Sequence, residues 1–497
     1  MKKNSLYTIF VSLLPALIFL AVLVLFYPYR EAFQRDSDEG VNLMKAYMVH
    51  LGYPLYDEIW SDQPPLLTIA IRVLIDLFGN SVGLIRTLVL LVSSLTFLAV
   101  YHILRIRRGT AYAILGAVIL FLHPTYVRLS TSIMVGAPAI AFAFLSMFFL
   151  LFWHRDRSYP ALVLSAFALA ISVGIKLFTG LLGVIIVGGL LLAEYVRTAG
   201  QAPSNRLRVV KPPVIWGLVF SAGVLSILIF IVGIENASQL AGSHLSGIAL
   251  EQYQREEFTI NYHLRNLLPT FFLAGIGTYL CVRAKDWYFL YFAIWSAVSY
   301  VSLLNHAPVW YHHQLLVSAP AAVLAAIAAG HMFKQLPEAA WKNGSFKLFL
   351  AILIGIILLF FDLRIPGFIR QFRLVPAGFP STELALTTQE EILLGRVSAL
   401  QSETSWFLTD LPIYAFRIGL PVPPDLAALT MKRFHSGELT EEEMIAAVFR
   451  YTPEQVLLGR TAYPQVEAAL ETDYVLIEQF GDRVRYYVRR DLAGSSP

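Results

Sequence analysis

A short stretch near the start of the chain, directly after its first hydrophobic run, concentrates acidic side chains. Residues 30–70 read REAFQRDSDEGVNLMKAYMVHLGYPLYDEIWSDQPPLLTIA, although only 14% of the whole chain is charged. Carboxylates can hold a divalent cation through their oxygens, and a single carboxylate can accept a proton from an attacking hydroxyl. The acids that could do this chemistry are Asp36, Asp38, Glu39, Asp57, Glu58 and Asp62.

The same acids could also simply begin a helix. Asp36 or Ser37 can act as an N-cap, Asp36 and Glu39 have the spacing of a capping box, and acids favour the positive end of a helix. Apolar residues follow at helical spacing, in a stripe that can lie on a membrane surface: Val41, Met44, Tyr47, Met48 and Leu51. Capping accounts for one or two acids and leaves the others, including Asp62 before a proline pair, without a role.

Composition indicates a polytopic membrane protein. Of 497 residues 57% are hydrophobic and 13% aromatic, and the mean hydropathy is +0.62, well above what a soluble core requires. The single cysteine, Cys281, excludes an internal disulfide and a metal site built from several cysteines. Nothing in the chain indicates a nucleic-acid partner.

Hydrophobic runs and basic clusters together predict the topology. The N-terminal run follows a basic start and lacks a cleavage site, so we interpret it as an uncleaved anchor whose N-terminus is cytoplasmic. Residues 64–79 are too short and too charged to cross, so we expect a helix on the outer surface. About 11 membrane-spanning helices result; after the N-terminal anchor they are 82–104, 111–125, 131–153, 159–175, 178–195, 214–234, 265–283, 287–304, 314–333 and 346–363.

The composition changes after the last predicted span. Residues 1–365 form the predicted transmembrane domain, with an outer loop at 29–81, and residues 366–497 form a predicted soluble α/β domain. Strand-like segments there include SWFLTD and VRYYVRR, and Thr440 is placed to cap a helix. An odd number of spans puts this domain outside a plasma membrane. We expect it to assist acceptor choice or stability and to hold no catalytic residue.

The outer loop resembles a known superfamily. DEG, then GYPLYDEIWSDQPPL, then FGNSVGLIR resemble polytopic glycosyltransferases of the GT-C superfamily, above all family 39 dolichyl-phosphate-mannose protein mannosyltransferases and bacterial aminoarabinose transferases. The resemblance implies an inverting transferase that moves a hexose or pentose from a polyprenyl-phosphate donor to a hydroxyl outside the membrane. The implied partners are that donor, membrane lipids and a lipid, glycan or protein acceptor.

The resemblance also implies roles for the acids. Asp38 matches the general base, and Glu39 its neighbour or a metal ligand. Asp36 and Asp62 are supporting or metal-binding candidates. Gln63 lacks the positive charge that some relatives have before the proline pair. If a divalent cation binds, these four acids must supply most of its ligands, and the sequence leaves open whether one does.

A leaving phosphate requires positive charge. The candidates are Lys176, Arg128, His312 and His313, although membrane-interface placement also explains Lys176 and the histidine pair. Arg86 follows the FG turn, and we expect it to form an ion pair with a carboxylate.

Two other classes of function fit parts of the sequence. A transporter could have an acid-lined vestibule, but transporters usually place ionisable groups near the bilayer midplane in matching halves. A sensor or scaffold could use the outer domain, but it would leave the acidic loop without a purpose.

Overall fold

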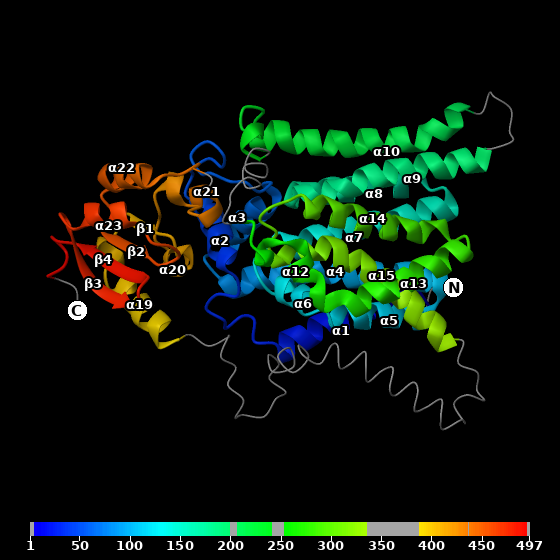
Figure 1. The fold of residues 1–497 in the computed structure, drawn as a ribbon, viewed down its shortest axis with the longest axis horizontal. Helices are drawn as coiled ribbons and strands as arrows, with labels where there is room; N and C mark the ends of the chain where they lie inside the picture. Colours follow the sequence, from blue (N-terminus) through cyan, green and yellow to red (C-terminus); the bar gives the residue numbers. More distant parts are fainter. Residues whose placement is uncertain (1–3, 199–205, 241–252, 335–386, 436, 495–497) are drawn as a thin grey trace, which may run out of the picture.

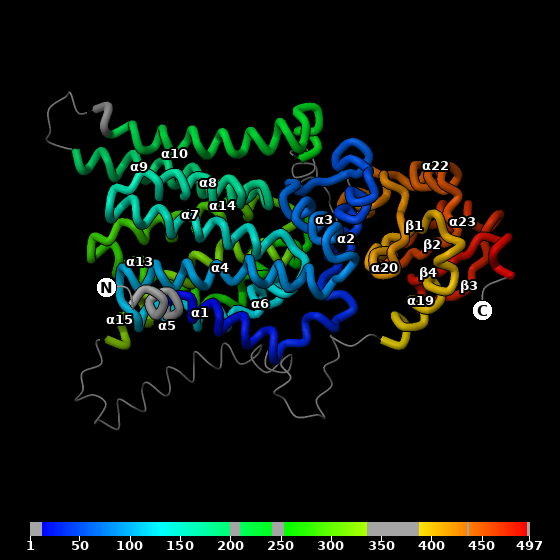
Figure 2. The backbone as a smooth tube through the Cα atoms, turned by 180° about the vertical axis from the view of Figure 1, so that it is seen from behind, coloured from blue at the N-terminus to red at the C-terminus, as the bar shows by residue number. Residues whose placement is uncertain are grey.

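The computed structural model describes residues 4–198, 206–240, 253–334, 387–435 and 437–494. The predicted span at 346–363 lies outside these residues. Long helices form a bundle, the C-terminal domain lies at one end of it, and the N-terminus lies at the other end (Figure 1). The view from behind shows the same arrangement (Figure 2).

The bundle consists of helices that match most predicted spans. Helix α8 (Tyr159–Ile175) coincides with its predicted span. The others are α1 (Asn4–Phe26), α4 (Val82–Arg108), α5 (Thr110–Phe121), α6 (Pro124–Ser130), α7 (Gly136–Asp156), α9 (Leu181–Thr198), α10 (Arg206–Ile227), α13 (Leu268–Arg283), α14 (Leu290–Leu304) and α15 (Leu315–Lys334).

Six described helices are long and apolar enough to cross a membrane, or seven if one bent pair forms a single span. That pair is α5 and α6, which meet at an angle of 74°. A continuous span had been predicted at 111–125. The chain turns there because His123 caps α6 and Pro124 is its first residue, where proline's missing N–H costs nothing.

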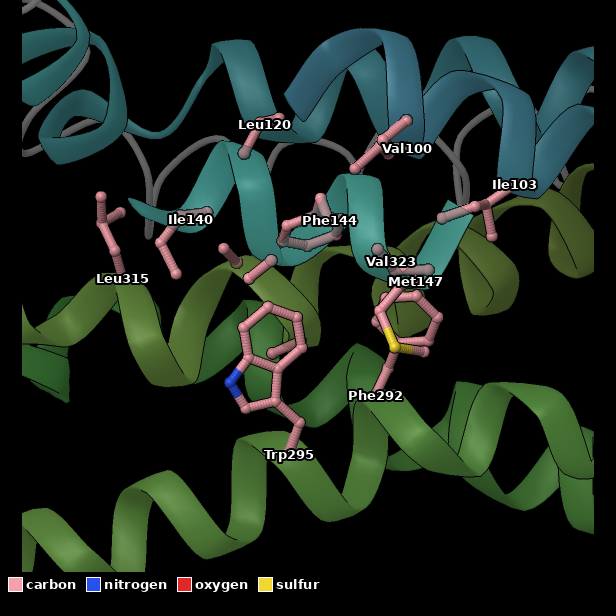
Figure 3. Packing of buried hydrophobic residues seen from close by; sticks show 14 of the residues in the cluster. Val100, Ile103, Leu120, Ile140, Phe144, Met147, Phe292, Trp295, Leu315 and Val323 are labelled. Carbon is pink, nitrogen blue, oxygen red and sulfur yellow. The ribbon is translucent and has the colours of Figure 1, made fainter. Parts of the chain in front are cut away.

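Aromatic and aliphatic side chains pack between the helices in the centre of the bundle. Figure 3 shows Phe144 of α7 facing Trp295 of α14, with their ring centroids 5.2 Å apart. Both side chains are buried. The packing of such rings fixes the positions of the helices. It therefore also fixes the polar residues at the helix ends.

The basic helix ends gather at the end of the bundle that holds the N-terminus. Arg108 at the end of α4 lies 3.0 Å from Asp286, which follows α13. Arg197 in the last turn of α9 lies 2.7 Å from Glu194, and Arg157 after α7 also pairs with Glu194. Ion pairs therefore join helix ends that are far apart in sequence.

The outer loop forms two helices between the bundle and the C-terminal domain: α2 (Ser37–His50) and α3 (Leu66–Phe78). Helix α3 corresponds to the predicted surface helix. The apolar stripe of α2 does not lie on a membrane, because α2 is buried within the protein from Glu39 to Met48. Tyr47 of α2 donates to the Gly419 carbonyl of the C-terminal domain (2.8 Å).

Close packing explains the glycine of the DEG motif. Helix α20 (Pro412–Ile418) lies against α2. A Cβ at Gly40 would lie 2.7 Å from the backbone nitrogen of Ile413. Only glycine allows this approach, so the C-terminal domain and the acidic loop pack closely against each other.

The C-terminal domain has a four-stranded sheet in the order β1-β2-β4-β3. Strands β1 (Phe407–Thr409) and β2 (Gln455–Leu458) are parallel, and β4 (Val484–Arg489) pairs antiparallel with β2 and with β3 (Tyr474–Phe480). Thr440 caps α22 (Glu441–Tyr451) in a capping box, as predicted. The remaining helices are α19 (Thr388–Ala399), α21 (Met431–His435) and α23 (Pro464–Leu470).

Candidate functional site

A cavity of about 350 Å³ lies where the bundle, the outer loop and the C-terminal domain meet. Its charged and imidazole lining comes from all three parts. The carboxylates are Asp36, Asp38 and Asp62, the cations are Lys45, Lys176, Lys432 and Arg460, and the histidines are His306, His312 and His313.

Asp36 is buried and is the N-cap of α2, accepting a hydrogen bond from the backbone N–H of Asp38 (3.1 Å). Its other oxygen accepts from the Tyr311 hydroxyl and lies 3.9 Å from the Arg128 guanidinium. Burial, reinforced by the nearby Asp38 charge, raises the pKa of Asp36 to about 6. Asp36 is therefore a poor candidate for a free metal ligand, because both oxygens are engaged.

Asp38 is the accessible carboxylate of the helix start, with 46% of its side chain exposed. The guanidinium of Arg460 lies 3.5 Å from it and also donates to the Ser37 carbonyl. The Arg460 side chain is mostly buried, but the contact is long and half of Asp38 faces solvent, so the carboxylate is accessible to a substrate.

A buried carboxylate of the C-terminal domain, Asp410, holds the loop that carries Arg460. Asp410 accepts from the backbone N–H groups of Gly459 (2.8 Å), Arg460 (2.7 Å) and Thr461 (3.4 Å). Burial raises the pKa of Asp410 to about 6 despite these donors. The loop after β2 is therefore held in the shape that directs Arg460 across the domain boundary.

Of the acids at positions 57, 58 and 62, only one lines the cavity. Asp62 lines the cavity, and Lys432 of the outer domain lies 3.7 Å from it. Asp57 is exposed and accepts from Asn236 (2.8 Å), and Glu58 is also exposed. Neither Asp57 nor Glu58 lines the cavity.

Glu39 is fully buried and does not line the cavity. Its oxygens accept from Nε and Nη2 of Arg86 (2.9 and 2.7 Å) and from the backbone N–H groups of Ile133 (2.8 Å) and Arg35 (2.7 Å). Burial alone would raise the pKa of Glu39, but Arg86 and the amides outweigh it and hold this pKa below its ordinary value. Arg86 thus makes the ion pair that the sequence suggested, and Glu39 has no oxygen left for a metal.

Within the part of the chain that the structure describes, two cavity lysines form no ion pair with a carboxylate, although Asp62 and Asp38 attract both of them. Lys45 is 2% exposed, and within the described residues its ammonium donates only to the Ser61 hydroxyl (3.1 Å). Lys176, at the end of α8, is 4% exposed, and its ammonium has no hydrogen bond or ion pair within the described residues. Burial lowers the pKa of Lys45, and it lowers the pKa of Lys176 to about 8.

Of the other predicted phosphate ligands, the two histidines line the cavity and Arg128 does not. His312 and His313 both line it, with ring centroids 4.4 Å apart, and His313 accepts from the Trp310 backbone N–H (3.0 Å). Arg128 does not line the cavity; its guanidinium lies 4.8 Å from the centre of the Tyr311 ring.

The described residues include no group of three or more His, Cys, Asp or Glu side chains that could hold a metal ion. Each of the four proposed acidic ligands faces a cation instead, namely Arg128, Arg460, Arg86 or Lys432. We therefore derive no step through a metal.

Sequence reasoning missed three of the cavity's four cations. Lys432 and Arg460 lie in the C-terminal domain, which we expected to assist acceptor choice or stability and to hold no catalytic residue. Lys45 carried a signal, since Asp38 and Lys45 are seven residues apart and so lie on one face of a helix. The cavity-lining residues of α2 from Asp38 onward show that spacing: Asp38, Val41, Asn42 and Lys45.

Comparisons with known proteins agree on one fold. Residues 62–216 match the family model described as dolichyl-phosphate-mannose-protein mannosyltransferase. No curated protein sequence matches the chain. The structure is similar to ArnT from Cupriavidus metallidurans bound to undecaprenyl phosphate, with a TM-score of 0.62, 14% identity and 99% of each chain covered.

A second solved structure is more distant. The oligosaccharyltransferase of Archaeoglobus fulgidus in its apo form has a TM-score of 0.54 and 13% identity, over 92% of this chain and 70% of that one. The predicted resemblance is confirmed: the chain has the GT-C fold, a polytopic helical membrane architecture with a small C-terminal sheet domain.

Proposed function

We propose that this protein is an inverting glycosyltransferase that moves a hexose or pentose from a polyprenyl-phosphate donor to an acceptor hydroxyl. The observation that carries the proposal is that one cavity holds an accessible carboxylate, Asp38, and a buried lysine, Lys176, whose ammonium forms no ion pair with any residue that the structure describes. A base and an anion-binding cation are the two groups that this reaction needs. The GT-C fold and the undecaprenyl phosphate bound by ArnT support the donor class.

The reaction is a displacement at the anomeric carbon of the sugar. Asp38 accepts the proton of the acceptor hydroxyl as its oxygen forms the new bond to that carbon. The bond from the carbon to the phosphate oxygen breaks, and its electron pair stays on the polyprenyl phosphate. Attack opposite to the leaving group inverts the configuration, and Lys176 stabilises the charge that develops on the phosphate.

The structure favours Asp38 over its neighbours as the base. Glu39 is bound on both oxygens by Arg86 and backbone amides, and Asp36 is held by Tyr311 and by the start of α2. Asp62 lines the same cavity and is the alternative base.

Transfer itself is the test of this proposal. Membranes that contain the protein, supplied with a labelled polyprenyl-phosphate sugar, should pass the label to an acceptor, whereas membranes without the protein should not. Movement of the labelled donor across the membrane without any transfer would favour a transporter.

We further propose that the N-terminus faces the cytoplasm of a plasma membrane and that the cavity and C-terminal domain lie outside. The basic helix ends and the N-terminus lie at one end of the bundle, and the C-terminal domain lies at the other. Positive charge next to spans accumulates on the cytoplasmic side.

A reporter fused after Gly109 should therefore report the cytoplasm, and one fused after Pro497 should report the outside. The measurement is the activity of a paired cytoplasmic and external reporter in intact cells. A cytoplasmic signal at Pro497 would contradict this orientation.

A further inference from the structure

A buried lysine without a counter-ion is energetically unfavourable unless a bound anion compensates its charge. An ammonium group loses its hydration when buried, and only a paired anion or several hydrogen bonds can compensate. Within the described residues, the Lys45 ammonium has one neutral hydrogen-bond partner, and the Lys176 ammonium has none. Both line the same cavity.

Carboxylates are present in the cavity, but cations of the outer domain already pair with them. Arg460 lies 3.5 Å from Asp38, and Lys432 lies 3.7 Å from Asp62. Asp38 and Asp62 attract both buried lysines at longer range, but within the described residues neither carboxylate forms an ion pair with them. The outer domain therefore leaves the positive charge of the two lysines for an anion that enters from elsewhere.

The two lysines come from different elements that meet at this cavity. Lys45 lies on the face of α2 that also carries Asp38, and Lys176 lies between α8 and the short helix at Leu177–Gly180. Helix α8 belongs to the bundle, whereas α2 belongs to the outer loop. An anion bound by both would lie at the junction of membrane and outer parts, next to the proposed base.

We propose that Lys45 and Lys176 together form the binding site for the phosphate of the polyprenyl donor, with Lys45 as a ligand not anticipated from the sequence. This inference rests on the proposed function and assigns part of its site. Lysine is well suited to phosphate as a compact positive charge with three donors.

The change in phosphate charge during the reaction explains the need for two lysines. The donor is a phosphodiester with one negative charge. When the bond to the sugar breaks, the electron pair remains on the phosphate, and the product is a monoester that approaches two negative charges at neutral pH. A pair of ammonium groups therefore stabilises the leaving group more than the donor, which is the condition for faster chemistry.

Binding of undecaprenyl phosphate to the purified full-length protein tests this inference. Lys45→Met and Lys176→Met should each weaken binding by about tenfold to a hundredfold, as loss of a hydrogen bond to a charged group does. Lys45→Gln keeps a donor for Ser61 but removes the charge, so it should weaken binding similarly. Lys285→Met removes an exposed lysine near the basic helix ends and serves as the charge control.

Thermal stability without lipid distinguishes this account from a structural role for Lys45. Replacing an unpaired buried charge by an apolar side chain of similar volume should leave the melting temperature of Lys45→Met unchanged or raise it. If the only role of Lys45 were its hydrogen bond to Ser61, Lys45→Met and Ser61→Ala would both lower the melting temperature. Lys45→Met would then bind the lipid normally.

The outcomes separate this inference from the proposed function. Normal binding of undecaprenyl phosphate by folded Lys45→Met or Lys45→Gln overturns the two-lysine site and leaves the glycosyltransferase proposal intact. Failure of the folded wild-type protein to bind undecaprenyl phosphate contradicts both. Normal binding combined with lost transfer in the lysine variants also overturns the inference, because it would assign the lysines to the acceptor.

Discussion

Asp38→Asn should reduce glycosyl transfer by about 10²–10⁴-fold, the usual contribution of a positioned general base. The variant should fold normally. Asp36, and not Asp38, caps α2, and Asn keeps the size of the Asp38 side chain beside Arg460, which lies 3.5 Å away. Transfer of labelled sugar by purified, monodisperse protein is the measurement, with binding of undecaprenyl phosphate measured in parallel and expected to be retained.

Ser37→Ala is the matched control, because Ser37 adjoins Asp38 and lines the cavity but cannot accept the proton at neutral pH. Its transfer rate should stay near that of the wild type. Near-normal turnover of Asp38→Asn would move the base to Asp62, the other accessible carboxylate of the cavity. Glu39 would not be the next choice, because Arg86 occupies both of its oxygens.

Arg86→Ala should destabilise the protein by about 3–5 kcal/mol, the cost of leaving one partner of a buried ion pair uncompensated. Arg86 is fully buried, and it also donates to the carbonyls of Tyr29 (2.8 Å) and Ala32 (2.7 Å). Its loss would leave the Glu39 carboxylate buried without the Arg86 counter-ion. It would also remove the two hydrogen bonds that hold the chain before α2. Equilibrium unfolding in detergent measures the change.

Two further variants test whether burial of the ion pair causes this loss of stability. Arg72→Ala breaks a pair on α3, where Arg72 lies 2.8 Å from Asp76 and both side chains are partly exposed, so it should cost no more than about 1 kcal/mol. Arg86→Met combined with Glu39→Met removes both charges and should recover most of the stability. Equal stability of Arg86→Ala and Arg72→Ala would contradict a structural role for the buried pair.

The sequence predicted the fold wherever local signals were strong. Ser158 and Pro160 mark the start of α8, and the apolar run up to Ile175 matches its length. Thr440 and Glu443 mark the start of α22. The surroundings of α2 were not predictable, because an apolar stripe packs equally well against lipid or against α20, and the choice depends on residues nearly four hundred positions away.

The candidate site was predictable only in part for the same reason. The acidic loop identified Asp36, Asp38 and Asp62, all of which line the cavity. The partners that distinguish these acids come from distant segments, as Arg460 does for Asp38 and Lys432 does for Asp62. Spacing along one chain segment cannot reveal such contacts.

The measurement that tests the central claim most directly is transfer from a labelled undecaprenyl-phosphate sugar by the purified protein in lipid vesicles, with extracted membrane lipids, glycans and proteins offered as acceptors. We expect wild-type protein to release undecaprenyl phosphate and to place the sugar on an acceptor with inverted anomeric configuration, and we expect Asp38→Asn to do neither. Intact donor and unmodified acceptors after incubation with folded, lipid-binding wild-type protein would contradict a glycosyltransferase.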